Sequence, residues 1–157
     1  MRHSKTPKRI VEPDKIYNNL LIARFINRVM YNGKKTVAQD VVYGALDIVK
    51  EKGQDPLEVF EKAIQSVSPK LEVKARRVGG ASYQIPSEVR PERRLSLAIR
   101  WIIEAARKRS NKEYHTFSEK LAQELLDATQ NLGEAIRKRD LMQKNAEANR
   151  AFASFKY

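Results

Sequence analysis

The hydrophobic positions near the start of the chain recur at the spacing of an α-helix. Between Asn18 and Gly33 the apolar residues stand three or four apart; they are Leu21, Ile22, Phe25, Ile26, Val29 and Met30. Polar residues such as Arg24 and Arg28 fall on the other side. This pattern predicts an amphipathic helix, which the Asn32-Gly33 pair ends.

Two further helices have recognisable first turns. Thr36 and Gln39 form a capping-box pattern ahead of a second apolar stripe, and they place the N-cap of the second helix at Thr36. Asp55 stands where an N-cap residue belongs, with Pro56 at the first helical position. Pro69 ends this third helix because the residue before a proline disfavours helical backbone.

Between the third helix and Pro91 the spacing of the hydrophobic residues changes, from the 3.6-residue repeat of a helix to the two-residue repeat of a strand. Apolar and charged residues alternate from Leu71 to Arg76, and the Gly79-Gly80 pair tolerates the positive φ of a tight turn. The pattern predicts a β-hairpin over residues 70–90. Because an isolated two-stranded hairpin is marginally stable in water, it must pack against the helices or a ligand.

Helical spacing returns after Pro91 and continues to the basic cluster at residues 107–109. Thr116 and Glu119 repeat the capping-box pattern before a fifth helix, and a last helix with a thin apolar face extends over about residues 133–150. The expected fold is mainly α: a single-domain bundle of about six helices, with a protruding β-hairpin between helices three and four.

The two chain ends complete this organisation of one domain over residues 1–157. Residues 1–15 form a basic N-terminal arm in which Pro7 and Pro13 oppose a helix, and residues 150–157 form a C-terminal tail. Tyr83 on the hairpin and Phe152 in the tail can stack on bases, or dock against a neighbouring element.

Charge narrows the choice of partner. The 157 residues include 31 Lys and Arg against 19 Asp and Glu, a net charge of +12, so a polyanion is the first partner to consider. Cysteine is absent, which excludes disulfide scaffolds, thiolate metal sites and cysteine nucleophiles. The longest apolar run is the four residues Leu20 to Ala23, far short of the ~20 that span a bilayer. Nucleic acid is therefore favoured over a membrane.

No constellation for catalysis or for a metal or cofactor is recognisable. His3 and His115 each lack a second histidine at metal-ligand spacing. The segment Gly33-Lys34-Lys35-Thr36 fails as a phosphate-binding loop because Arg28 stands where the upstream glycine belongs. We expect no enzyme activity, no cofactor and no small-molecule substrate.

The basic residues gather around the hairpin. From Lys70 to Arg94 there are seven cations against three anions, and a projecting basic ribbon suits contact with phosphates. One alternative stays open, an architectural DNA-binding protein whose hairpin, with Gln84-Ile85-Pro86, forms an arm that bends DNA. Three helices follow the hairpin, and nothing in the chain requires the dimer symmetry such a protein needs.

Several motifs resemble the family of small ribosomal subunit protein seven, of the bacterial type. The most specific is the hairpin segment, and the others follow in family order; they are Lys70-Leu71-Glu72-Val73-Lys74, Arg76-Arg77-Val78-Gly79-Gly80-Ala81, Tyr83-Gln84-Ile85-Pro86, Phe25-Ile26-Asn27, Arg100-Trp101 and Ala146-Glu147-Ala148-Asn149-Arg150. The resemblance covers the chain from about Pro13 to its end.

The resemblance implies a cytoplasmic, non-catalytic protein of the small ribosomal subunit. Members bind the 3′ major domain of 16S rRNA, nucleate assembly of the subunit head, and lie near the mRNA path and E-site tRNA. They also touch small-subunit ribosomal proteins nine and eleven. These properties are expectations for this chain.

The candidate rRNA-binding residues are cations of the arm, the turn after the first helix, the hairpin and the fourth helix. They are Arg2, Lys5, Lys8, Arg9, Lys34, Lys35, Lys74, Arg76, Arg77, Arg93, Arg94, Arg100, Arg107 and Arg109. The resemblance places Gly79, Gly80 and Tyr83 at the hairpin tip near tRNA and mRNA, whereas the helical spacing of Trp101 suits the core. The arm lacks the family's usual Pro-Arg-Arg start.

Overall fold

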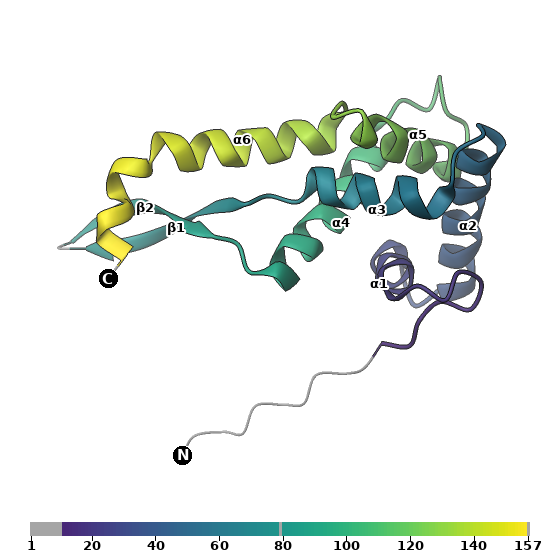
Figure 1. Ribbon diagram of the computed structural model, residues 1–157, viewed down its shortest axis with the longest axis horizontal. Coiled ribbons are helices and arrows are strands. Elements are labelled where there is room, and N and C mark those ends of the chain that lie inside the picture. The colour runs from purple at the N-terminus through teal and green to yellow at the C-terminus, as the bar shows by residue number, and fades with distance from the viewer. Residues whose placement is uncertain (1–10, 79, 157) are drawn as a thin grey trace, which may run out of the picture. The chain divides into compact units, whose positions relative to one another are not determined.

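The computed structural model describes residues 11–78 and 80–156 (Figure 1). The predicted arm residues Arg2, Lys5, Lys8 and Arg9 and the predicted turn residue Gly79 lie outside the described residues. The elements follow in the order α1 (Leu20–Val29), α2 (Lys35–Glu51), α3 (Pro56–Val67), β1 (Leu71–Val78), β2 (Ala81–Glu88), α4 (Pro91–Lys108), α5 (Phe117–Thr129), α6 (Glu134–Ala148) and a 3-10 helix η1 (Arg150–Lys156). This order confirms the mainly α fold with a hairpin between the third and fourth helices.

The chain divides into two compact units, residues 1–39 and 40–157, and the boundary falls within α2. In the first unit, the carboxylate of Asp14 accepts the backbone N–H groups of Ile16 and Tyr17 at 3.1 and 3.2 Å. The Asn19 side chain then caps α1 by accepting the N–H of Leu21 at 2.7 Å. The Asp14 contacts close the turn before α1, and the Asn19 contact gives a partner to a backbone donor that the start of the helix leaves unpaired.

The predicted N-cap of α2 is wrong. The helix begins at Lys35, so Thr36 lies inside its first turn instead of preceding it. The reason is the preceding turn, in which Asn32 and Gly33 both have positive φ, of 51° and 74°. This turn brings the chain into helical geometry early, and the N–H of Ala38 already bonds to the carbonyl of Lys34 at 3.3 Å.

Within the second unit, α3 and α4 pack on α5, and apolar side chains fill the space between them. The fully buried side chains include Phe60 of α3, Ile102 of α4 and Leu121 of α5. Trp101 is also buried, at 7% exposure, as its spacing predicts. This bundle is the scaffold from which the hairpin projects (Figure 1).

The predicted caps of α3 and α5 are confirmed. Asp55 accepts the N–H of Leu57 at 3.0 Å, with Pro56 in the first turn of α3. Thr116 accepts the N–H of Glu119 at 3.2 Å while the Glu119 carboxylate accepts the N–H of Thr116, so both halves of the capping box form. Each cap satisfies backbone donors that a helix start leaves unpaired.

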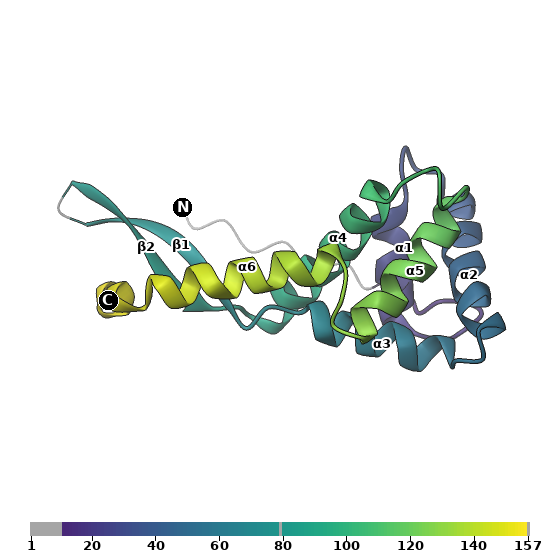
Figure 2. The same cartoon turned by 90° about the horizontal axis from the view of Figure 1, so that it is seen from above.

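The hairpin is antiparallel, with Leu71 opposite Glu88 at its base and Val78 opposite Ala81 at its tip. Gly80, in the turn, has a φ of +91°, a conformation that side chains other than glycine rarely adopt. Helix α6 runs from the bundle along the hairpin and packs on both strands, and η1 packs on β2 (Figures 1 and 2). The hairpin therefore packs against helices, as expected for a two-stranded hairpin that is only marginally stable in isolation.

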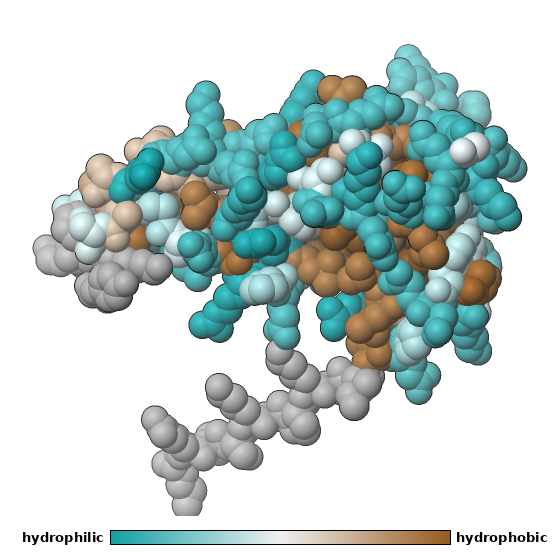
Figure 3. Space-filling view, viewed as in Figure 1, coloured by the Kyte–Doolittle hydropathy of each residue, from teal (hydrophilic) through white to brown (hydrophobic). Residues whose placement is uncertain are grey.

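Helix α6 has the thin apolar face predicted for it. It buries Ala135, Ile136 and Ala146, and it ends at Ala148, two residues before the predicted limit. Hydrophilic side chains cover much of its visible surface (Figure 3). Within residues 11–78 and 80–156, no helix is long and apolar enough to cross a membrane.

Candidate nucleic-acid interface

The two faces of the hairpin differ in what covers them. Successive strand residues point to opposite faces. One face, which we name the covered face, carries Ile85, which is 4% exposed, and Tyr83, whose ring lies 5.4 Å from that of Phe152 in η1. The other, the open face, carries the exposed side chains of Ala75, Arg77, Ser82 and Gln84. Lys74 and Arg76 lie opposite Ile85 and Tyr83 and are exposed, so the covered face also presents cations to solvent around its apolar contacts.

Tyr83, which the sequence placed near tRNA, packs within the protein on the covered face. Tyr83 is half-buried and lies opposite Arg76 in the register, and its ring meets Phe152 at an interplanar angle of 49°. This tilted pair is a favourable aromatic geometry. Of the two uses that the sequence left open for these aromatic rings, docking between elements is the one observed.

Glu72 organises the base of the hairpin. Its side chain is 4% exposed, accepts Arg93 Nε at 2.6 Å and pairs with Lys74 Nζ at 3.2 Å. Burial alone raises the pKa of this carboxyl, but the hydrogen bonds from Arg93 and Lys74 outweigh it and lower the pKa below the usual 4.5. The pairing ties β1 to the first turn of α4.

The cations paired with Glu72 keep most of their surface in solvent. The side chains of Arg93 and Lys74 are 58% and 61% exposed, so each can still donate outward. Arg100, two turns further along α4, is exposed as well, whereas Arg94 is half-buried and donates to the carbonyl of Val89 at 3.4 Å. The hairpin base and the start of α4 therefore form one basic region.

Two exposed cations at this base were not among the predicted site residues. Lys70 directly precedes β1, and Arg90 directly precedes α4. Both flank the hairpin at its base, because the N–H of Val89 bonds to the carbonyl of Lys70 at 3.1 Å. Their position next to the predicted strand ends was the signal that could have included them.

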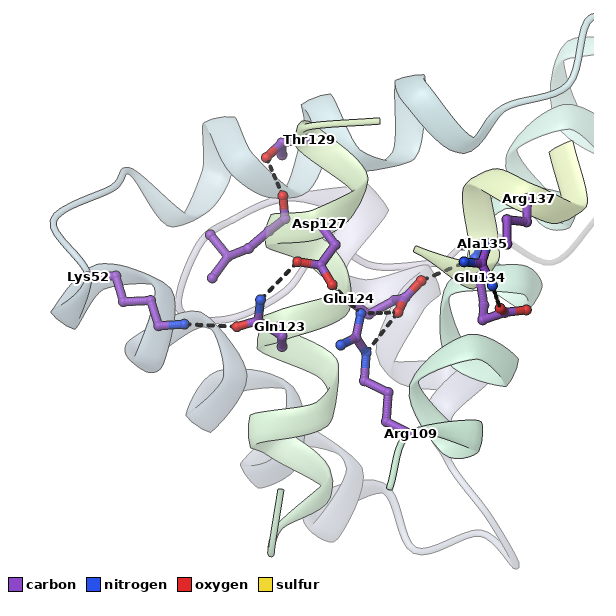
Figure 4. A network of polar contacts seen from close by, with 10 residues as sticks. Lys52, Arg109, Gln123, Glu124, Asp127, Thr129, Glu134, Ala135 and Arg137 are labelled. Atoms are coloured by element: carbon purple, nitrogen blue, oxygen red, sulfur yellow. Dashed lines mark hydrogen bonds and ion pairs between the residues drawn. The ribbon is translucent and has the colours of Figure 1, made fainter. Parts of the chain in front are cut away.

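Arg109 is not part of this exposed region. Its side chain is 17% exposed and pairs with Glu124 and Asp127, both at 2.5 Å (Figure 4). Burial alone lowers the pKa of the guanidinium, but the hydrogen bonds to Asp127 and Glu124 outweigh it and raise the pKa. Its neighbour Arg107 is exposed at the end of α4. The structure thus separates two residues that the sequence grouped in one cluster.

Lys34 and Lys35 belong to the first unit and are both exposed. They directly follow the Asn32-Gly33 turn, and Lys35 begins α2. Among the described residues no group of three His, Asp and Glu side chains is placed to hold a metal ion. The exposed cations and the polar side chains of the open face together suit contact with phosphates and nucleotide edges.

Comparison with known proteins identifies the family. A family model described as ribosomal protein S7p/S5e matches residues 1–150. The chain belongs to the ribosomal protein S7p/S5e family. This membership confirms the resemblance that the hairpin motifs indicate.

Individual members of the S7p/S5e family match this chain along its whole length. The small ribosomal subunit protein uS7 of Caldanaerobacter subterraneus subsp. tengcongensis is 55% identical over 157 residues, 99% of each chain. The protein of that name from Thermotoga neapolitana is 52% identical over an alignment of 158 residues that covers 100% of each chain. That from Clostridium novyi is 55% identical over 157 residues, 99% of each chain. The similarity therefore includes the hairpin, α4 and α6.

Proposed function

We propose that this chain is a structural, rRNA-binding component of the small ribosomal subunit. The observation that carries the proposal is membership of the S7p/S5e family along 150 residues, and its full-length relatives are named as small ribosomal subunit proteins. The basic region at the hairpin base and the net charge of +12 supply what RNA binding requires. The chain acts by binding and not by catalysis.

The specific target in this proposal is the 3′ major domain of 16S rRNA. Binding there nucleates assembly of the subunit head and brings the hairpin close to the mRNA path and E-site tRNA. Ribosomal proteins nine and eleven are the neighbouring proteins. These finer assignments rest on the hairpin motifs from Lys70 to Val89, which follow the family pattern closely.

The proposed division of labour follows from burial. The bundle of α3, α4 and α5 spends its apolar residues on the core, while exposed cations such as Lys74, Arg77 and Arg100 remain available to phosphates. Side chains cannot read the deep, narrow major groove of A-form RNA. Recognition therefore uses backbone shape, 2′-hydroxyls and unstacked bases.

A competition experiment tests this function. The purified protein is bound to a labelled 3′ major domain transcript and challenged with the same transcript unlabelled, with an unlabelled transcript of another rRNA domain, or with duplex DNA of equal length. We expect only the unlabelled 3′ major domain to compete at stoichiometric amounts. Equal competition by duplex DNA would support an architectural DNA-binding protein, and equal competition by the other rRNA domain would refute the specific target.

A further inference from the structure

A polar joint built around the buried Glu124 lies where α4 ends, α5 passes and α6 begins (Figure 4). We define the joint as Arg109, Glu124 and Asp127 with the backbone of Ala135. Arg109 donates to Glu124 Oε2 from Nε at 2.8 Å and from Nη2 at 2.5 Å, and also from Nη2 to Asp127 Oδ2 at 2.5 Å. The other Glu124 oxygen, Oε1, accepts the N–H of Ala135 at 3.1 Å.

The two oxygens of Glu124 thus bind different helices. The side chain is 1% exposed, and one oxygen accepts the guanidinium at the end of α4 while the other accepts a backbone donor in the first turn of α6. A negative charge is favourable at a helix N-terminus, where backbone N–H groups lack partners. Glu124 therefore serves as the cap that Gly133, the N-cap residue of α6, cannot supply from a side chain.

The turn between α5 and α6 is fitted closely to this carboxylate. Gly133 has a φ of +96°, and a Cβ at this position would lie 2.9 Å from Glu124 Oε1. A second contact fixes the end of α4, since Lys120 Nζ donates to the carbonyl of Arg109 at 2.8 Å. The joint therefore connects three helices at one point and leaves little room for a side chain at position 133.

The far end of α6 supports the hairpin. The helix has 15 residues, which at about 1.5 Å per residue gives a length of roughly 22 Å. Along this length it packs on both strands, and η1 continues from it to place Phe152 against Tyr83. Over such a helix, a tilt of about 10° at the joint moves the far end by roughly 4 Å.

We propose that Glu124 and Arg109 are positioning residues for the hairpin. The joint fixes the start of α6, α6 and η1 hold the covered face, and the open face is thereby presented at one place relative to the bundle. The RNA-related part of this inference rests on the proposed function; the mechanical part does not. The sequence predicted that Arg109, in its basic cluster, contacts phosphate. The joint gives this residue a structural role instead.

The test measures the position of the hairpin directly. The chain contains no cysteine, so Lys62→Cys on α3 and Ser82→Cys on the open face accept two spin labels unambiguously. Pulsed electron paramagnetic resonance then gives the distance distribution between the labels. In Glu124→Gln, which removes the charge and keeps the side-chain size, we expect the distribution to shift or broaden by about 4 Å, the displacement of a tilted helix of this length.

A matched control uses a second ion pair between the same two helices. Glu104 of α4 and Lys138 of α6 pair at 2.5 Å, but their side chains are 44% and 29% exposed. Glu104→Gln removes this pair without disturbing the joint, and we expect the distance distribution of the parent protein. Affinity for the 3′ major domain transcript is measured on the same samples, and we expect it to fall about tenfold or more in Glu124→Gln alone.

The outcomes separate this inference from the proposed function. An unchanged distance distribution in folded Glu124→Gln overturns the positioning role, and so does an equal change in Glu104→Gln. If Glu124→Gln does not fold, Arg109→Lys is measured instead, because lysine keeps the charge but not the bidentate geometry; unchanged distances there also overturn the role. Failure of the parent protein to bind the transcript refutes the proposed function and leaves the distance result intact.

Discussion

Removing the two adjacent arginines of β1 is the perturbation whose effect on RNA binding is easiest to calculate. Arg76 and Arg77 are both exposed, and adjacent strand residues point to opposite faces. Each phosphate neutralised adds about 0.7 to the slope of log affinity against log salt for single strands and about 0.9 for duplex. If each arginine contacts one phosphate, Arg76→Ala with Arg77→Ala lowers the slope by about 1.4 to 1.8.

The assay is titration of labelled 3′ major domain transcript with protein over a series of salt concentrations. Since both side chains are exposed, we expect a change in unfolding free energy of no more than about 0.5 kcal/mol, measured by urea denaturation. The control replaces Lys62 and Lys112, exposed cations on α3 and on the link before α5, and should keep the parent slope. A parent-like slope in the arginine variant would show that these two arginines do not contact phosphates and that the binding face lies elsewhere.

Three further predictions concern the parts that hold the interface. Thr116→Ala removes one half of a formed capping box and should cost about 1 kcal/mol in urea denaturation with RNA affinity unchanged; a binding defect without destabilisation would contradict this. Pairing lowers the pKa of Glu72 in the folded protein, so its contribution to stability is present above the unfolded pKa of 4.5 and is lost as the pH falls through the folded pKa. The difference in unfolding free energy between the parent and Glu72→Gln should therefore shrink below about pH 4.5. A constant difference from pH 7 to 3 would rule this out. Phe152→Ala removes a ring 5.4 Å from that of Tyr83, and hydrogen exchange should accelerate in β2 and not in α5.

Local signals in the sequence predicted the helices and the hairpin, because short-range interactions determine these features. Asp55 and Thr116 act within their own first turns, and the alternation beginning at Leu71 describes a strand regardless of what packs on it. The predicted N-cap of the second helix was wrong for an equally local reason. Its Thr36-Gln39 pattern was present, but the positive φ values at Asn32 and Gly33 brought the chain into the helix two residues earlier.

The candidate site was harder to predict because its organisation depends on contacts between distant residues. Glu72 pairs with Arg93, 21 positions away, and Glu124 pairs with Arg109, 15 positions away. Composition shows that cations are in excess but not which of them are paired inside the protein. The distinction between the covered and open faces also depends on where α6 and η1 pack, which the thin apolar face of α6 does not reveal.

Crosslinking of the protein to small-subunit rRNA, with both partners mapped to the residue, is the most direct test of the proposed RNA-binding surface and of its target. We predict protein crosslinks at the hairpin and its base, at residues such as Lys74, Arg77 and Arg100, and RNA crosslinks confined to the 3′ major domain. Crosslinks concentrated on α5, or on RNA outside that domain, would contradict it.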